Sequence, residues 1–364
     1  MTAVDYAGRM ERARALLAGR GIEVLLLSVG ADLPYFTGYR AMPLERLTML
    51  VLPVEGPATL VVAGLEAPRV ARQGEAFTLR PWGETEDPVE VVAGLCGSPG
   101  WAAVGDSTWS VFLLALQQRL PGAAFVPASA LTGELRMRKG PEEIDLLRQA
   151  GAAADRVVDR LDRHSFAGKS ERRLSAEIAA MTVEEGHEVS TFSIVASGPN
   201  GASPHHEAGD RVIGDGDAVV VDFGGRLAGY CSDTTRTFFV GEPPARFLDA
   251  FAAVRAAQQA GVEAVAPGVP AEEVDRAARR VITTAGYGLC FVHRTGHGIG
   301  LEEHEHPYVV EGNSAPLEEG MAFSVEPGVY LPGEFGVRIE DVVVVTAGGA
   351  ERLNHSSRDL HRVG

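Results

Sequence analysis

Short apolar runs alternate with amphipathic segments along the first 133 residues of the chain. Apolar residues recur at helical spacing over residues 4–19, and Gly21 separates this predicted helix from a buried strand at 22–27. The same pattern predicts one more helix, at 110–120, and further strands at 48–52, 58–62, 77–80 and 102–105. Strands and helices that alternate in this way predict an α/β domain.

The pattern changes after about residue 134. Gly140 and Pro141 then precede a predicted helix whose first turn is acidic. We expect two domains, residues 1–133 and 134–364, because 364 residues exceed the usual size of one domain. In the second domain, amphipathic spacing predicts two pairs of helices, at 141–163 with 170–186 and at 244–266 with 270–286. Each pair is followed by apolar strands, so this domain is expected to be α+β.

Two apolar strands after the first helix pair each carry an aspartate. Asp222 lies in the run 218–225 and Asp233 in the run 231–240, and the glycine-rich segment 224–229 predicts a hairpin turn between them. The two carboxylates should therefore lie close together. Bare carboxylates inside an apolar sheet repel each other and lose solvation, which favours protonation or a bound cation. We interpret the pair as metal ligands.

The same arrangement recurs later in the chain. Residues 216–224 align with residues 320–328 at a constant offset of 104, which places Glu326 at the position of Asp222. Glu340 lies in a further apolar strand, three residues beyond the offset position of Asp233, so the second hairpin is expected to have a longer loop. Helix 170–186 falls near residues 274–290 at the same offset. We therefore expect two copies of one unit, each with two helices and an acidic hairpin.

A histidine flanked by glycines, His297, lies between the two hairpins in the sequence. One imidazole and four carboxylates form an oxygen-rich set that suits manganese, cobalt, iron or zinc, and that exceeds the ligands of one catalytic ion. The predicted cofactor is two divalent metal ions, and the predicted ligands are Asp222, Asp233, His297, Glu326 and Glu340.

Five motifs around these positions resemble those of the pita-bread metallopeptidases, a family that includes prolidases, proline-specific aminopeptidases and methionine aminopeptidases. The motifs are Val-Asp222-Phe-Gly, Ser-Asp233-Thr-Thr-Arg-Thr-Phe, Gly-His297-Gly-Ile-Gly-Leu, Val-Glu326-Pro-Gly-Val-Tyr and Val-Arg338-Ile-Glu340-Asp. The resemblance extends from about residue 134 to residue 364 and implies a pita-bread catalytic domain with an internal pseudo-two-fold duplication. Residues 33–39 resemble a motif of the creatinase/prolidase N-terminal domain, which methionine aminopeptidases lack, so the two-domain branch is implied.

The resemblance implies a role for each metal ligand. Asp222 would bind one ion, His297 and Glu326 would bind the other, and Asp233 and Glu340 would bridge them. Glu326 would also carry a proton from the attacking water to the leaving nitrogen.

The resemblance also implies substrate-facing residues. His205, which follows Pro204 in a polar, glycine-rich loop, is the first candidate, with His206 as the alternative. His293 and His304 match family positions that line the pocket and contact the reacting carbonyl. Arg338 is either a structural ion-pair partner or a contact for the C-terminal side of the substrate, and Tyr330 is similarly placed.

These features imply a hydrolase that cleaves the peptide bond before proline, with manganese as the expected metal. The expected substrate is an Xaa-Pro dipeptide and the expected assembly is a homodimer. The first alternative is an Xaa-Pro aminopeptidase that acts on longer peptides. A non-catalytic binding protein and a creatinase-like enzyme without metal are disfavoured, because all five ligand residues are present.

Composition narrows the range of partners and locations. A formal net charge of −16 without a run of lysine and arginine argues against nucleic acid or an anionic membrane as the main partner. The three cysteines, Cys96, Cys231 and Cys290, are odd in number and lack metal-binding spacing, which predicts reduced thiols and a cytoplasmic protein. No apolar run resembles a signal peptide or a membrane span.

Overall fold

Residues 4–70 and 76–364 are described in the computed structural model. The chain divides into two units, Met1–Arg136 and Met137–Gly364, whereas the sequence pattern placed the division between residues 133 and 134. Helix α5 (Ser129–Met137) crosses the expected boundary. Most of this helix belongs to the first unit, because Leu131 and Thr132 are buried and Arg136 Nη1 lies 2.8 Å from Oδ1 of Asp32.

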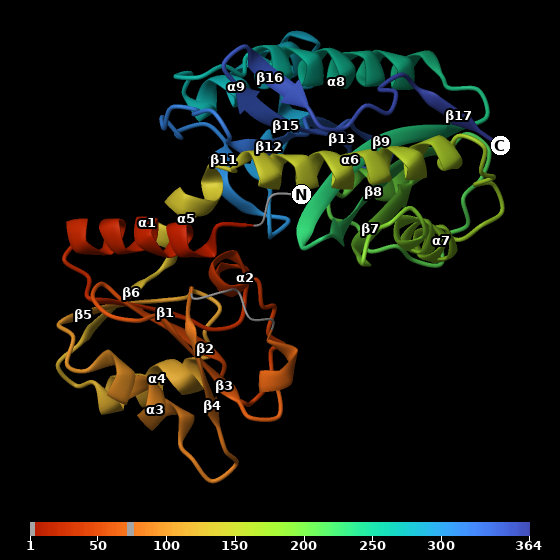
Figure 1. The fold of residues 1–364 in the computed structure, drawn as a ribbon. Coiled ribbons are helices and arrows are strands. Elements are labelled where there is room, and N and C mark those ends of the chain that lie inside the picture. The colour runs from red at the N-terminus through yellow and green to blue at the C-terminus, as the bar shows by residue number, and fades with distance from the viewer. Residues whose placement is uncertain (1–3, 71–75) are drawn as a thin grey trace. The chain divides into compact units, whose positions relative to one another are not determined.

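A six-stranded sheet forms the centre of the first unit (Figure 1). Its strands run in the order β4-β3-β2-β1-β5-β6, and β1 is antiparallel to β2 and parallel to β5. Helices α1 and α5 lie over one face and α3 and α4 over the other. The bounds are α1 Tyr6–Gly19, β1 Val24–Leu27, α2 Asp32–Thr37, β2 Met49–Pro53, β3 Thr59–Ala63, η1 Ala67–Arg69, β4 Thr78–Trp82, α3 Pro88–Cys96, β5 Trp101–Val104, α4 Ser110–Arg119 and β6 Ala124–Pro127.

The predicted strands and helices of this unit are confirmed within a few residues at each end. Helices α2, α3 and α5 and strand β6 were not predicted. They contain four to nine residues, and so short a segment holds too few positions for a helical or strand period to stand out.

The first half of the second unit packs two helices against a four-stranded sheet in the order β17-β9-β8-β7 (Figure 1). Phe166, Phe223 and Phe238 are fully buried in its core. The bounds are α6 Pro141–Leu161, α7 Glu171–Glu184, β7 Val189–Ser197, η2 Gly198–Ala202, β8 Ala218–Leu227, β9 Tyr230–Val240 and, at the end of the chain, β17 His361–Val363.

The second half repeats this layout with a five-stranded sheet in the order β11-β10-β12-β15-β16 and a two-stranded ribbon, β13-β14. The bounds are α8 Ala245–Glu263, α9 Ala271–Thr284, η3 Gly288–Cys290, β10 Gly296–Gly298, β11 Glu305–Val309, β12 Ala322–Val325, β13 Gly328–Leu331, β14 Phe335–Arg338, β15 Asp341–Thr346 and β16 Gly349–Arg352. Within the described residues, no helix combines the length and the apolar character that crossing a bilayer requires.

Matching backbone hydrogen bonds confirm the internal duplication and correct its register. Gly168 N donates to Ile213 O at 2.9 Å, and Gly268 N donates to Leu317 O at 2.8 Å. Helices α7 and α9 therefore correspond at an offset of 100, since they cover residues 171–184 and 271–284, whereas the strand positions after them correspond at 104. The predicted match of 170–186 with 274–290 was four residues out of register, because the extra residues come after helix α9 rather than before it.

The turn of the first acidic hairpin is shorter than the sequence suggested. Strands β8 and β9 stay paired as far as Leu227 and Tyr230, so the turn is only Ala228 and Gly229, with φ angles of 47° and 85°. Two positive φ angles suit a two-residue hairpin turn, and a glycine at the second position adopts one easily. The predicted turn residue Gly224 instead lies inside β8, where a Cβ would stand 2.3 Å from the carbonyl oxygen of Ser232.

Candidate active site

The first acidic hairpin brings Asp222 and Asp233 onto one face of the sheet. Asp222 on β8 pairs with Thr235, and Asp233 on β9 pairs with Gly224, two positions along the ladder. Because side chains alternate between the two faces of a sheet, these two carboxylates are diagonal neighbours on the same face. Both side chains are buried.

The second hairpin is interrupted where its two glutamates lie. Val325 pairs with Asp341 at the end of the β12–β15 ladder, and Gly328 pairs with Arg338 in the β13–β14 ribbon. Glu326 and Glu340 therefore face each other between the two ladders. The sequence pattern had instead placed both glutamates inside continuous strands. Pro327 accounts for one side of the break, because proline has no N–H to donate to a strand partner.

The short strand β10 presents His297 to these carboxylates. Its Nδ1 lies 3.2 Å from the carbonyl oxygen of Gly298, which leaves Nε2 directed at the acids, 3.2 Å from Oε1 of Glu326 and 3.7 Å from Oδ2 of Asp233. The glycine before it permits this approach, because a Cβ at Gly296 would lie 1.8 Å from the carbonyl oxygen of Ser324.

The donor set fits a bound metal. Ligand atoms of Asp233, His297 and Glu340 lie within 4.8 Å of one another. Oδ1 of Asp222 and Oε1 of Glu340 are buried and have no hydrogen-bond partner among the described residues. A buried carboxylate oxygen without a partner is costly, and a cation between the oxygens would satisfy both.

The electrostatics of the cluster lead to the same conclusion. Burial, followed by the neighbouring carboxylates, raises the pKa of Asp233 and of Glu340 well above the ordinary values, and burial also raises the pKa of Asp222. Burial would raise the pKa of Glu326 as well, but the hydrogen bond and charge of His297 hold it at about 2. Without a cation, the raised pKa values favour the protonated forms of these carboxyl groups.

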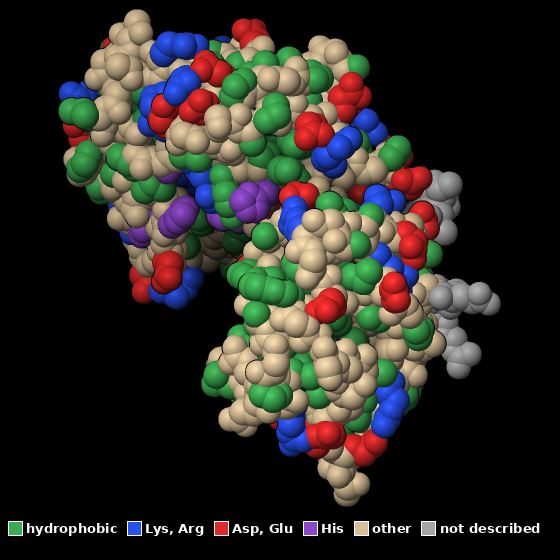
Figure 2. All heavy atoms as spheres, turned by 90° about the vertical axis from the view of Figure 1, so that its left-hand side faces the viewer, with side chains coloured by type: hydrophobic (Ala, Val, Ile, Leu, Met, Phe, Trp, Pro, Cys, Tyr) green, Lys and Arg blue, Asp and Glu red, His purple; other side chains and the backbone are tan. Residues whose placement is uncertain are grey.

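A cavity of about 520 Å³ opens over the carboxylates. Histidine side chains are visible together at the surface in Figure 2. The lining residues include every residue predicted to bind metal or to face the substrate, except Tyr330 and the alternative, His206. They are Phe192, Ile194, Pro204, His205, Asp222, Asp233, His293, Arg294, His297, Glu303, His304, Glu326, Arg338 and Glu340.

The structure separates the two adjacent histidine candidates. His205 lines the cavity, whereas Nε2 of His206 lies 2.8 Å from Oε2 of Glu171. Glu171 is fully buried and also accepts hydrogen bonds from the backbone and side chain of Ser197. It therefore holds the loop that carries His205.

The two remaining pocket histidines differ in their surroundings. Nε2 of His293 lies 2.8 Å from the hydroxyl of Tyr330, and burial lowers the pKa of His293. The ring of His304 lies 3.9 Å from that of His297, centroid to centroid. Burial, together with the charges of His297 and Arg294, lowers the pKa of His304 to about 4, so His304 is neutral near pH 7.

Arg338 is tied to the protein through all three of its guanidinium nitrogens. Nη2 lies 2.7 Å from Oδ2 of Asp222, Nη1 lies 2.8 Å from the hydroxyl of Tyr330, and Nε lies 3.1 Å from Oγ1 of Thr235. Nη1 also lies 3.3 Å from the carbonyl oxygen of Pro204. This side chain therefore links Asp222 to the loop before His205.

Sequence reasoning missed several residues of the site. Arg294 and Glu303 line the cavity, and their positions beside His293 and His304 were the available signal. Thr235 and Ser324 contact two of the predicted ligands, since their hydroxyls lie 2.6 Å from Oε2 of Glu340 and 3.1 Å from Oε1 of Glu326. Cys231 is buried and is a free thiol, like Cys96 and Cys290.

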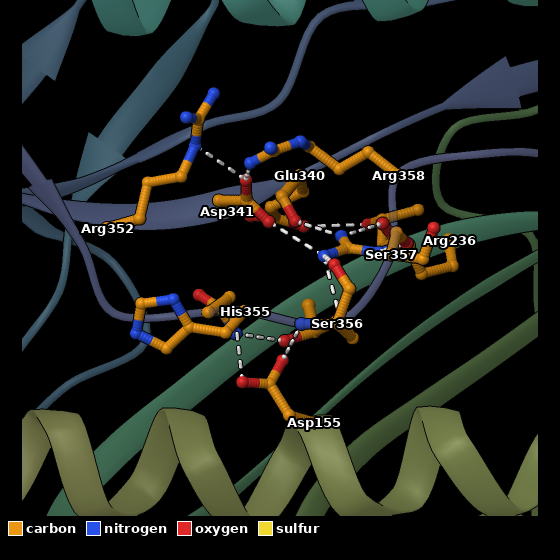
Figure 3. Close-up of polar contacts among 12 residues, drawn as sticks. Asp155, Arg236, Glu340, Asp341, Arg352, His355, Ser356, Ser357 and Arg358 are labelled. Carbon is orange, nitrogen blue, oxygen red and sulfur yellow. Dashed lines mark hydrogen bonds and ion pairs between the residues drawn. The ribbon is translucent and has the colours of Figure 1, made fainter.

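A buried ion-pair network fixes the backbone at Glu340 (Figure 3). Nη1 of Arg236 donates to the carbonyl oxygen of Glu340 at 2.5 Å, and Nη2 of Arg236 lies 2.8 Å from Oδ1 of Asp341. Oδ2 of Asp341 accepts from Arg358 at 2.9 Å and from Arg352 at 3.2 Å. Asp341, the residue after Glu340, is therefore held on both of its carboxylate oxygens.

Comparison with known proteins gives a consistent result. Residues 145–347 match metallopeptidase family M24, and residues 9–138 match the creatinase/prolidase N-terminal domain. The chain is 45% identical over 360 residues to a Mycobacterium tuberculosis protein named probable dipeptidase PepE, an alignment that covers 98% of this chain and 96% of that protein. It is 36% identical over 349 residues to the Xaa-Pro dipeptidase of Lactobacillus helveticus, covering 93% and 94%.

The fold has a close counterpart among solved structures. The recombinant prolidase of Thermococcus sibiricus superposes with a TM-score of 0.94 at 37% identity, and the superposition covers 100% of both chains.

Proposed function

This chain belongs to metallopeptidase family M24 and is a metal-dependent peptidase with the pita-bread fold, and we propose that it cleaves the Xaa-Pro bond of dipeptides. The observation that carries this proposal is the buried cluster of four carboxylates and His297 at the base of the cavity. The names of the two relatives, a probable dipeptidase and an Xaa-Pro dipeptidase, support the same reaction.

We assign the metal ligands as follows. Asp222 would hold one divalent ion, His297 and Glu326 would hold the second, and Asp233 and Glu340 would serve as ligands to both. The partnerless oxygens of Asp222 and Glu340 support this assignment. Manganese is the proposed metal, because an oxygen-rich set with one imidazole suits it. When bound, such ions lower the pKa of water and polarise the scissile carbonyl.

The side chains of the cavity handle the protons. Water attacks the scissile carbonyl carbon, Glu326 takes a proton from the water, and the same carboxyl group delivers it to the proline nitrogen as the C–N bond breaks. A carboxyl group can perform both transfers when it lies within hydrogen-bond reach of both atoms. His304 donates a hydrogen bond to the carbonyl oxygen as negative charge develops there. His205 and His293 hold the substrate.

The cavity also suits the shape of proline. The nitrogen of an Xaa-Pro bond carries no hydrogen and its ring fixes the backbone, so the enzyme must recognise a ring rather than an N–H group. Phe192, Ile194 and Pro204 provide apolar surface on the cavity wall beside the ligands. We assign this apolar wall to the proline ring.

We also propose that the enzyme works as a homodimer in the cytoplasm. The three free thiols support a reducing compartment. Sedimentation of the purified protein at several concentrations tests the dimer, and a monomer at every concentration contradicts it.

A substrate panel tests the proposed function. Xaa-Pro dipeptides, Xaa-Pro-Yaa tripeptides and a matched Xaa-Ala dipeptide are supplied to metal-loaded enzyme, and free proline is measured. We expect the highest kcat/KM on Xaa-Pro dipeptides. Equal or higher efficiency on tripeptides would identify an Xaa-Pro aminopeptidase, and preference for Xaa-Ala would contradict proline specificity.

A further inference from the structure

A dipeptide substrate brings a free carboxylate into a cavity that is already acidic. Asp222, Asp233, Glu326 and Glu340 line its base, and Glu303 lines its wall. In Xaa-Pro, the C-terminal carboxylate lies one residue beyond the scissile carbonyl, so it must bind close to these acids. A cation with free N–H groups would bind this carboxylate directly and offset the negative charge of the acids.

Two arginines line the cavity, and one of them has four of its five N–H groups in hydrogen bonds within the protein. Arg338 is buried, with its side chain 3% exposed, and its guanidinium binds Asp222, Tyr330 and Thr235 at 2.7–3.1 Å. To offer a substrate carboxylate a fork of two N–H groups, it would have to give up one of these partners. Removing one partner of a buried ion pair leaves an uncompensated charge, which is strongly unfavourable. Arg338 therefore serves Asp222 rather than the substrate.

The second arginine is held in place and retains free donors. The guanidinium carbon of Arg294 lies 4.3 Å from the centre of the Tyr308 ring, a cation–π contact that holds the group in place. Among the described residues, the side-chain nitrogens of Arg294 have one polar contact, Nη2 at 3.5 Å from Nδ1 of His304. That distance is at the outer limit for a hydrogen bond.

The position of Arg294 relates it to the reacting centre. Its carbonyl oxygen lies 2.7 Å from Nδ1 of His293, and its guanidinium reaches His304. Both histidines line the cavity beside His297. An arginine fork fixed between two substrate-facing histidines can bind a carboxylate through two parallel hydrogen bonds.

We propose that Arg294 binds the C-terminal carboxylate of the dipeptide and thereby selects substrates of two residues. The inference rests on the proposed function, since it names the group that recognises the end of an Xaa-Pro substrate. Each added residue displaces the carboxylate by roughly 3.5 Å along an extended chain, beyond the reach of a fixed guanidinium. Arg294 would then determine the length of the substrate, whereas the residues around the metal site would carry out the cleavage.

The test compares an Xaa-Pro dipeptide with its C-terminal amide, which removes the charge and replaces one acceptor oxygen by an NH2 donor. Arg294→Met keeps much of the side chain's length but loses the cation, and with it the cation–π contact with Tyr308. We expect the ratio of kcat/KM for the acid to that for the amide to fall by about 30-fold or more in this variant, mainly through KM. Arg294→Lys keeps the charge without the fork, so its ratio should lie between the two. An unchanged ratio in Arg294→Met overturns the proposal.

Two further arms separate this inference from the proposed function. Arg172→Met makes the same change at an exposed arginine paired with Asp210, and it should leave the ratio unchanged. Calorimetry with proline and prolinamide needs no turnover. The wild type should bind proline more tightly, and Arg294→Met should lose this difference; equal loss of both ligands contradicts a carboxylate contact. If the wild type hydrolyses neither peptide, the proposed function fails, and the calorimetry still decides whether Arg294 binds a carboxylate.

Discussion

Nη2 of Arg338 lies 2.7 Å from Oδ2 of Asp222, and the other oxygen of Asp222 has no partner among the described residues. The ion pair fixes one oxygen and so directs the other toward the cluster. Arg338→Met should therefore weaken metal binding and lower kcat for Xaa-Pro acids and amides alike. Removing one partner of a buried pair costs roughly 3–5 kcal/mol, so the effect should be large. Metal titration with both substrates measures it, and impairment confined to free acids would make Arg338 the carboxylate anchor instead of Arg294.

Glu171 should position His205 without binding metal. Its buried carboxylate accepts from Ser197 N at 2.8 Å and from His206 Nε2 at 2.8 Å, on either side of His205. Glu171→Gln replaces one acceptor oxygen by a donor, so the loop should lose its anchor. We expect kcat/KM to fall by about tenfold or more and stability to fall by about 1–3 kcal/mol, with bound metal per chain unchanged.

A matched control lies on the same helix. Glu177 is 26% exposed and pairs with Lys169 away from the cavity residues. Glu177→Gln should leave kcat/KM near the wild-type value. Loss of metal in Glu171→Gln would show that the loop supports the ligands rather than the substrate histidine.

Asp341 should contribute to stability because it forms ion pairs with three arginines next to Glu340. Its pair with Arg236 is buried, with side-chain exposures of 0% and 1%. Asp341→Asn removes the charge that compensates Arg236 and should lower the unfolding free energy by about 3 kcal/mol. Denaturant unfolding measures the change. The exposed pair of Asp359 with Arg255 provides the control, since Asp359→Asn should cost less than about 1 kcal/mol. Similar losses of unfolding free energy in both variants would mean that the buried network stabilises the fold no more than an exposed ion pair does.

His187 predicts an acid-dependent loss of stability. Burial lowers its pKa below the ordinary value, against the opposing hydrogen bond to the Thr182 carbonyl. As pH falls through about 6.5, the unfolded chain takes up a proton that the folded chain does not, so stability falls; above pH 7 both forms are neutral and the effect vanishes. His187→Gln should flatten the dependence of unfolding free energy on pH between 7 and 5, by up to about 1.4 kcal/mol per pH unit. The control is His355→Gln at an exposed histidine. Equal slopes in all three proteins would contradict the assignment.

The sequence predicted the elements that local patterns determine. Apolar spacing with glycine and proline at the ends located α6 to α9 closely, and the recurrence of acidic residues located both hairpins. The breaks at Glu326 and Glu340 were not predicted, because they depend on which strands pair across the sheet. The same limit applies to the two arginines of the cavity. The guanidinium of Arg338 is hydrogen-bonded to Asp222, whereas that of Arg294 lies on the Tyr308 ring and keeps N–H groups for a ligand. These contacts depend on the folded chain, and the spacing of residues along the sequence does not predict them.

The most direct test of the account is a metal titration of demetallated enzyme, with bound ions and hydrolysis of an Xaa-Pro dipeptide measured on the same samples. The cluster of Asp222, Asp233, His297, Glu326 and Glu340 predicts no hydrolysis without metal and a rate that saturates when about two divalent ions are bound per chain. His297→Ala should lose one ion and nearly all activity, whereas His304→Ala should keep both ions and lose about a hundredfold in rate. Full hydrolysis by protein that elemental analysis shows to be free of metal would contradict the central claim.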